Sequence, residues 1–202
     1  MKNTDVLVIG GSAAGIMAAI TANKHYSEKN VTLVRKEEKV LIPCGIPYTL
    51  ETVNGPENNL IPDGAVTDKG IELIIDEVIT IDKENKKVKL KTDKQITYDK
   101  LILATGSKPL VPPINGHDLK GVYSVKKDFE LLEEIKNKLN KSKDVVIIGG
   151  GFIGVEFADE CRKGGNINVT IVEIMDHILS LVCDDELCLK AENKLKENGV
   201  NI

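Results

Sequence analysis

A short pattern that occurs twice constrains the fold of this chain more than any other feature. Residues 5–15 read DVLVIGGSAAG, and residues 144–154, which begin 139 positions later, read DVVIIGGGFIG. Each copy joins an apolar run of strand length to a glycine-rich turn and a helix-forming segment, and a second apolar run follows at 31–35 and 169–173. Two strands joined through a helix pair in parallel, so each copy predicts half of a nucleotide-binding fold.

The segment between the two copies predicts an antiparallel insertion. IELIIDEVITID (71–82) and KVKLKT (87–92) read as short strands with a hairpin-like connection, the turn KENK. QITYDKLILATG (95–106) then reads as a buried strand that ends in a tight Thr-Gly turn. We therefore predict an α/β fold of two Rossmann-like dinucleotide-binding units with parallel sheets, the first with an inserted antiparallel β-meander.

Prolines between Lys108 and Pro113 predict a linker, and the helical spacing of apolar residues in DFELLEEIKNKLN (128–140) predicts a helix after it. The predicted domains are therefore 1–112 and 113–202. The chain ends on GVNI, which reads as a third strand of the second unit, and a doubly wound domain needs more strands than that. We expect the second domain to be truncated at its C-terminus and the chain to be the N-terminal part of a longer protein.

Composition excludes several classes of function. The net charge is -4 and no basic cluster occurs, which argues against a nucleic-acid surface. No apolar run is long enough for a signal peptide or a membrane span, so we expect a cytoplasmic protein with no membrane partner. Four cysteines are too few for a disulfide scaffold, and three scattered histidines lack metal-ligand spacing.

The glycines of both turns have the spacing that a bound pyrophosphate requires. Glycine permits a sharp bend, a close approach to the phosphates and tight helix packing, while the helix N-terminus offers free N–H groups. The second turn has all three glycines, at Gly149, Gly151 and Gly154. The first has Gly10 and Gly15, with Ser12 at the close-approach position, where its hydroxyl can donate to phosphate.

The residue at the end of the second strand of each unit is placed to contact the ribose of the bound nucleotide. Glu173 can accept hydrogen bonds from ribose hydroxyls and repels a 2′-phosphate, which favours NADH over NADPH. Arg35 holds the equivalent position in the first unit and cannot accept a hydrogen bond. Either its guanidinium stacks on adenine or meets phosphate, or Glu37 or Glu38 holds the ribose.

With both fingerprints, TYDKLILATGSKP (97–109) and GGGFIGVEFA (149–158), the chain resembles the pyridine nucleotide-disulfide oxidoreductase family. The resemblance covers almost the whole chain. It implies FAD in the first unit and NADH in the second. PCGIPY (43–48) narrows it to the single-cysteine branch, which includes coenzyme A-disulfide reductases and NADH oxidases, because no second cysteine follows Cys44 at short spacing.

The family implies that NADH reduces the flavin and that the flavin reduces a sulfur at Cys44. A helix starting near Cys44, with Pro47 in its first turn, would favour the reactive thiolate. A lone thiolate can cycle through a mixed disulfide or a sulfenic acid. Cys183 and Cys188 lie in an acidic, helix-like stretch and are not expected to form a redox pair.

Two positions depart from the family pattern. Ala13 stands where peroxidase and water-forming oxidase members carry a histidine, which makes peroxide reduction less favoured than thiol-disulfide exchange. Phe152 stands where many members have a tyrosine over the nicotinamide pocket, and Glu156 matches a family glutamate near flavin and nicotinamide.

The predicted catalytic residue is thus Cys44, and no metal site is predicted. The predicted cofactor-binding residues are those of the two glycine turns, the two strand ends and the flavin motif: Gly10, Ser12, Ala13, Ala14, Gly15, Arg35, Lys36, Pro43, Ala104, Thr105, Gly106, Gly149, Gly151, Phe152, Ile153, Gly154, Glu156 and Glu173.

These residues predict an FAD-dependent enzyme that oxidises NADH and reduces a small disulfide or persulfide, such as coenzyme A disulfide. The alternatives are an NADH oxidase that reduces oxygen, an electron-transfer reductase serving a small iron-sulfur protein, and a dinucleotide sensor without catalysis. The flavin motif and Cys44 argue against the sensor. We expect a homodimer in the full-length protein, and little flavin binding or turnover in this piece alone.

Overall fold

The structure is a computed structural model that describes residues 2–165 and 167–202. The chain divides into two compact units, and the division is not continuous along the sequence. The first unit runs up to Pro43 and resumes over Leu60–Pro112, and the second comprises Cys44–Asn59 and Pro113–Ile202. The predicted division was 1–112 and 113–202, so the segment 44–59 groups with the second unit instead of the first.

The first unit is built on one six-stranded sheet with the order β3-β2-β1-β6-β5-β4. Strands β1, β2, β3 and β6 are parallel neighbours, whereas β4, β5 and β6 pair antiparallel. The strands are β1 (Lys2–Ile9), β2 (Val31–Arg35), β3 (Glu72–Ile75), β4 (Val78–Asp82), β5 (Lys87–Leu90) and β6 (Gln95–Leu103). The predicted parallel sheet with an antiparallel meander is confirmed.

The structure corrects two details of the predicted insertion. IELIIDEVITID forms two strands, and the first of them, β3, joins β2 in the parallel part of the sheet instead of the meander. Strand β6 is buried only in alternation at its start, and Leu103 at its end is 61% exposed. The alternation arises because β6 belongs to the meander through its first residues and to the parallel sheet along most of its length.

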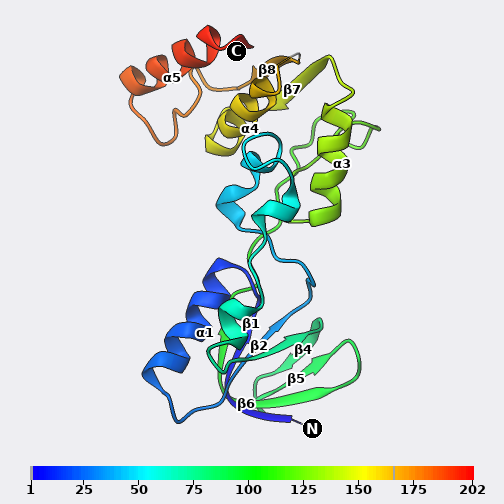
Figure 1. Cartoon of the computed structure of the whole chain (residues 1–202), viewed down its shortest axis with the longest axis vertical. Helices are drawn as coiled ribbons and strands as arrows, with labels where there is room; N and C mark the ends of the chain where they lie inside the picture. Colours follow the sequence, from blue (N-terminus) through cyan, green and yellow to red (C-terminus); the bar gives the residue numbers. More distant parts are fainter. Residues whose placement is uncertain (1, 166) are drawn as a thin grey trace. The chain divides into compact units, whose positions relative to one another are not determined.

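Both faces of the first sheet are covered where β1 passes through its middle, which is why β1 is apolar from Val6 to Ile9. Val6 and Val8 point to a cluster with Ile16 and Ala19 of α1 (Ala13–His25), and the short helix α2 (Gly64–Thr67) adds Val66 to it. Figure 1 shows α1 lying along one face of this sheet. Leu7 and Ile9 point to the opposite face, where they pack with residues of β5 and β6.

The second unit contains a parallel three-stranded sheet with the order β7-β8-β9. Its strands are β7 (Asp144–Ile148), β8 (Asn168–Val172) and β9 (Val200–Asn201). Its helices are α3 (Phe129–Leu139), α4 (Phe152–Lys163) and α5 (Asp185–Glu197), and α4 packs on β7 and β8 while α5 packs on β9. The predicted helix before the second glycine turn and the predicted third strand at GVNI are both confirmed.

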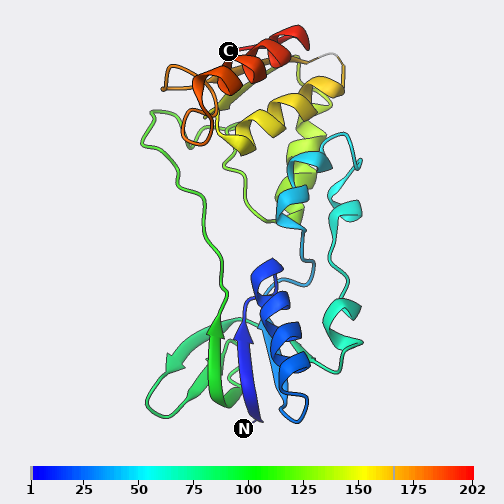
Figure 2. The same cartoon turned by 90° about the vertical axis from the view of Figure 1, so that its left-hand side faces the viewer.

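The segment 44–59 contains only short 3₁₀ turns, so the predicted helix from Cys44 is wrong. The turns are η1 (Pro43–Gly45), η2 (Pro47–Thr49) and η3 (Pro56–Asn59). A proline cannot donate a backbone hydrogen bond, so it is tolerated at the first position of a helical turn but not further along a helix. Pro47 and Pro56 are the first residues of η2 and η3, and each begins a new short turn. The turn η2 packs on α4 and η3 packs on α3, the helix drawn beside the cyan segment in Figure 2.

No helix in the described ranges 2–165 and 167–202 is long and apolar enough to cross a membrane.

Candidate functional site

The first glycine turn leaves no room for a side chain at Gly10 or Gly15. Gly10 has φ +112°, and a Cβ added there would lie 2.1 Å from the carbonyl oxygen of Ala104. A Cβ on Gly15 would lie 1.7 Å from the carbonyl oxygen of Gly10. Strand β1, helix α1 and the end of β6 therefore meet at a contact that only glycine permits, which brings the flavin motif at Ala104 against the first turn.

Hydrogen-bond donors gather at the start of α1. Ser12 is the N-cap residue, yet its side chain makes no capping hydrogen bond. Its hydroxyl oxygen is buried and has no hydrogen-bond partner among the described residues. Ala13 and Ala14 follow in the first helical turn, whose N–H groups lack intrahelical acceptors. An orphaned hydroxyl beside free N–H groups fits a phosphate group.

The second glycine turn repeats this geometry. Gly149 has φ +104°, and a Cβ on Gly154 would lie 1.9 Å from the carbonyl oxygen of Gly149. A Cβ on Gly151 would meet nothing within 4 Å, so this position is open. Phe152 and Ile153, the first two residues of α4, are 57% and 64% exposed. The turn therefore has an open approach for a ligand, bordered by an exposed aromatic ring.

Glu173 follows β8 directly and binds the second turn through its carboxylate. Oε2 accepts a hydrogen bond of 2.6 Å from the N–H of Gly150, and Oε1 accepts from the N–H groups of Ile174 and Met175 at 2.7 and 2.9 Å. The bond from Met175, followed by that from Gly150, holds the pKa of Glu173 below its ordinary value. The carboxylate is therefore an anion at neutral pH, fixed beside the glycine turn.

Arg35, at the equivalent position of the first unit, is buried and engaged within the protein. Its Nε donates to the carbonyl of Glu37 at 2.8 Å, and a terminal nitrogen donates to the carbonyl of Glu38 at 3.0 Å. The same nitrogen lies 2.5 Å from a carboxylate oxygen of Asp63. Only 2% of the side chain is exposed. The guanidinium therefore holds the turn after β2 in place, and this supports neither stacking on adenine nor contact with phosphate.

The remaining predicted contacts of the first unit lie at its surface. Thr105 and Gly106 follow β6 and are exposed, and Gly106 has φ +72°. Lys36 is exposed, and its ammonium lies 3.9 Å from a carboxylate oxygen of Glu37. Pro43 is half-buried at the end of the first unit. These residues are accessible, and within the described residues no hydrogen bond or ion pair joins them to one another.

Glu156 lies on α4, in the turn that follows the glycines. It is half-buried and makes no hydrogen bond or ion pair within the part of the chain that the structure describes. A carboxylate in this state is available to a ligand that approaches the second turn.

Cys44 is exposed and lies in η1, and the residues near it are needed for the packing of the segment. A Cβ on Gly45 would lie 2.0 Å from the side-chain oxygen of Asn59, so only glycine lets these two parts of the segment meet. Pro47 is buried in η2. The backbone around Cys44 is thus folded tightly on itself, while the thiol stays accessible.

The other three cysteines are free thiols in different surroundings. Cys161 is buried in α4, and its burial raises its pKa to about 11. Cys188 is buried, and its sulfur contacts the carbonyl of Cys183 at 3.8 Å. Among the described residues, no group of three acidic, histidine or cysteine side chains is arranged to hold a metal ion.

One functional contact was missed by sequence reasoning. Glu160 of α4 is fully buried and accepts two hydrogen bonds from Thr52, at 2.8 Å from the N–H and 2.6 Å from the hydroxyl. The signal was present, because Glu160 lies in the apolar stripe of α4 between Phe157 and Cys161. A glutamate in such a stripe is rarely buried without a partner.

Two named relatives are similar to this chain over almost its whole length. The chain is 36% identical over 200 residues to the NAD(P)H sulfur oxidoreductase (CoA-dependent) of Pyrococcus abyssi, which covers 96% of this chain and 44% of that protein. It is 30% identical over 209 residues to the NADH oxidase of Methanocaldococcus jannaschii, with 97% and 46% covered. The chain therefore spans about half the length of these relatives.

The fold agrees with a solved relative. The structure of a NAD-dependent persulfide reductase from A. fulgidus matches 98% of this chain and 39% of its own length, with a TM-score of 0.86 and 32% identity. Residues 4–202 also match the family model described as pyridine nucleotide-disulphide oxidoreductase. FAD and NAD(P)H are the cofactors of this family, which agrees with the predicted FAD and nicotinamide nucleotide, while the preference for NADH stays a prediction. The chain belongs to the pyridine nucleotide-disulphide oxidoreductase family.

Proposed function

We propose that the full-length protein is an FAD-dependent oxidoreductase that oxidises NADH and uses Cys44 to reduce a low-molecular-weight disulfide or persulfide, such as coenzyme A disulfide. The observation that carries the proposal is the exposed thiol of Cys44 in a segment that contains no second cysteine. A single accessible thiol suits exchange with a small disulfide, because its partner sulfur must come from the substrate.

The glycine turns would hold the two nucleotides. In the first unit, the free hydroxyl of Ser12 and the first N–H groups of α1 would hold the FAD pyrophosphate. In the second unit, the open position at Gly151 would let a pyrophosphate approach the start of α4. When bound, FAD supplies the two-electron chemistry that links the nicotinamide to sulfur.

Glu173 would select the nicotinamide nucleotide. Its carboxylate is held as an anion beside the second turn and retains lone pairs that can accept from ribose hydroxyls. The same charge would repel a 2′-phosphate, which favours NADH over NADPH.

Cys44 would carry the exchange step. Its thiolate attacks a disulfide RSSR, the S–S bond breaks, and a mixed disulfide forms while RS⁻ leaves. Two electrons and one proton then release RSH and restore the thiolate. The relatives named sulfur oxidoreductase and persulfide reductase support a sulfur substrate of this kind.

The direct test is anaerobic NADH oxidation by the full-length protein with coenzyme A disulfide or polysulfide as acceptor. Cys44→Ser should abolish turnover, because serine cannot form the mixed disulfide. Cys183→Ser, which changes a partly exposed thiol of the second unit, is the matched control and should retain turnover. Sulfur-dependent turnover that persists in Cys44→Ser would contradict the proposal. Wild-type protein that oxidises NADH only after oxygen is admitted, with no turnover on sulfur acceptors, would contradict it as well.

A further inference from the structure

A buried carboxylate of α4 binds the segment that carries Cys44. Glu160 accepts hydrogen bonds from the N–H and the hydroxyl of Thr52, at 2.8 and 2.6 Å, and from the ammonium of Lys163 at 2.7 Å. The Glu160 side chain has no exposed surface, whereas the Lys163 side chain is 45% exposed. The Glu160 carboxylate is therefore shielded from solvent, and the partly exposed ammonium of Lys163 balances its charge. We call the contact between Glu160 and Thr52 the anchor.

Glu160 is charged in this anchor. Burial alone raises the pKa of Glu160, but the hydrogen bonds from Lys163 and Thr52 outweigh that effect and leave the pKa below its ordinary value. A hydrogen bond to a charged acceptor stabilises more than one between neutral groups. The two bonds to Thr52 are consequently stronger ties than an uncharged side chain would form.

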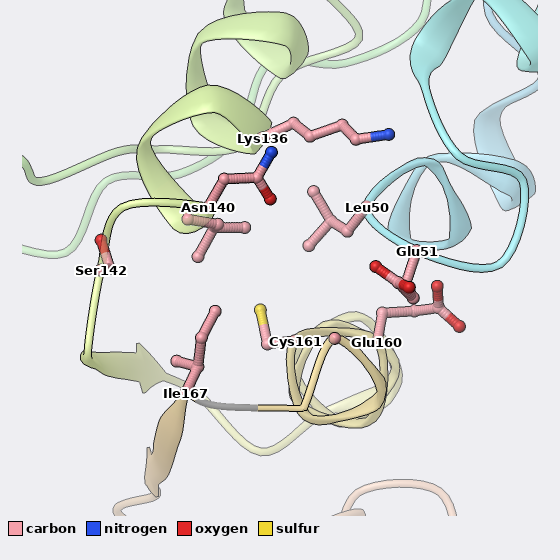
Figure 3. A pocket seen from close by; sticks show the side chains of 10 residues that line it. Leu50, Glu51, Lys136, Asn140, Ser142, Glu160, Cys161 and Ile167 are labelled. Carbon is pink, nitrogen blue, oxygen red and sulfur yellow. The ribbon is translucent and has the colours of Figure 1, made fainter.

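A cavity beside Glu160 makes its hydrogen bonds to Thr52 more important for holding the segment. A cavity of about 280 Å³ lies beside the anchor, bordered by Leu50 and Glu51 of the segment, Leu139 of α3, and Cys161 and Ile167. Figure 3 shows the Glu160 carboxylate directed toward the segment near Glu51, while the Cys161 sulfur points into the open space. Apolar packing is thus interrupted on this side. The hydrogen bonds to Thr52 hold the segment there, together with the packing of η2 on α4 and a hydrogen bond of 2.6 Å from the ammonium of Lys136 to the side-chain oxygen of Asn54.

The segment transmits this hold toward Cys44. Within it, the N–H of Val53 donates to the carbonyl of Tyr48 at 2.9 Å, and the hydroxyl of Thr49 donates to the carbonyl of Ile46 at 2.7 Å. Cys44 follows Pro43 within the 3₁₀ turn just before Ile46. These bonds brace the segment from Val53, the residue after Thr52, to Ile46, the residue after the turn that holds the thiol.

We infer that Glu160 is a positioning residue that fixes Cys44 relative to the nucleotide-binding turn of the second unit. Helix α4 starts at Phe152, directly after the glycine turn, and carries Glu160 further along the same helix. The turn that would hold NADH and the anchor for the Cys44 segment are therefore parts of one rigid element. The inference rests on the proposed redox role of Cys44.

The test uses four variants of the full-length protein. Glu160→Gln keeps the shape but removes the charge, and Thr52→Val removes the hydroxyl alone. Thr52→Ser restores the hydroxyl, and Asp159→Asn removes the other carboxylate that pairs with Lys163, at 2.9 Å, without contact to Thr52. The last two are the matched controls.

Two readouts separate positioning from stability. Amide hydrogen exchange in 44–59 should accelerate about tenfold in Glu160→Gln and Thr52→Val, because each loses a charge-assisted hydrogen bond. Disulfide-dependent kcat should fall about fivefold or more, with KM for NADH and reduction of ferricyanide, which needs no thiol, unchanged. Both controls should stay within about twofold of wild type in every assay.

Equal losses of disulfide and ferricyanide turnover, in step with thermal stability, would overturn the inference in favour of a purely structural role. Unchanged disulfide turnover in both Glu160→Gln and Thr52→Val would overturn it as well. Cys44→Ser, assayed beside them, tells the two proposals apart. If that variant keeps disulfide turnover, the proposed function fails, whereas its loss together with normal Glu160→Gln activity refutes only the positioning role.

Discussion

Gly154 and Gly151 lie three residues apart in the second glycine turn, and the structure predicts opposite consequences for an added methyl group. At Gly154 a Cβ would lie 1.9 Å from the carbonyl oxygen of Gly149, so the start of α4 must move away from β7. At Gly151 the added Cβ meets no atom within 4 Å, and φ is −73°, which alanine adopts freely. We therefore expect Gly154→Ala to damage the fold and Gly151→Ala to spare it.

The magnitudes follow from the packing. Forcing an extra carbon into a filled contact costs about 1–3 kcal/mol, and a backbone neighbour that cannot rotate away places Gly154→Ala at the upper end. Alanine regains roughly 1 kcal/mol of helix propensity in α4, which leaves a net loss of about 2 kcal/mol. For a cooperatively unfolding unit of about 150–250 residues, that loss lowers Tm by about 4–8 °C.

The assay is thermal unfolding of the full-length protein with and without NADH. Gly154→Ala should show the lower Tm in the absence of nucleotide. Gly151→Ala should match wild type without NADH but bind it about tenfold more weakly, because the methyl group occupies the approach to the pyrophosphate. A Tm of Gly154→Ala within about 1 °C of wild type would refute the packing argument. Unaltered NADH affinity in Gly151→Ala would refute the assignment of the turn.

Three further predictions concern charge and thiol chemistry. The folded-state pKa of Glu173 is lowered, so its contribution to stability is present above the unfolded carboxyl pKa and is lost as pH falls through the folded pKa. The free energy of urea unfolding of Glu173→Gln should therefore differ from that of wild type at pH 7, and the difference should vanish in acid. Arg35→Met should destabilise the protein by about 1–3 kcal/mol in urea unfolding, because it leaves two carbonyls and the carboxylate of Asp63 without their donor. A stability equal to that of wild type would show that the guanidinium holds nothing in place. Cys161, whose pKa is raised to about 11 by burial, should resist iodoacetamide at pH 8 while Cys44 reacts. Peptide-level mass spectrometry measures the labelling, and equal labelling of the two cysteines would contradict the burial of Cys161.

The elements that depend on local pattern were predictable from the sequence. The repeated strand, turn and helix units rest on apolar runs and glycines, which act over a few residues, and both units formed as expected. The position of Glu173 beside the glycine turn also follows from the sequence, since the end of the second strand in a parallel unit faces that turn, while its contact with a ribose stays a prediction.

The features that depend on distant contacts were not predictable. Arg35 stands where a carboxylate was expected, and its partner Asp63 comes from a loop that no local pattern connects with β2. The segment 44–59 fell within the predicted first domain because the boundary was placed at the prolines near residue 113, whereas in the structure it packs on α3 and α4 of the second unit. The helix predicted at Cys44 failed because prolines and a close contact between Gly45 and Asn59 decide the local backbone.

The central claim is that Cys44 is a second redox centre beside the flavin. The most direct test is an anaerobic titration of the full-length protein with NADH, followed by the visible spectrum, in wild type and in Cys44→Ser. The account predicts uptake of about two reducing equivalent pairs per subunit by wild type and about one by the variant. Uptake of one pair by both proteins would contradict it and would make Cys44 a structural residue.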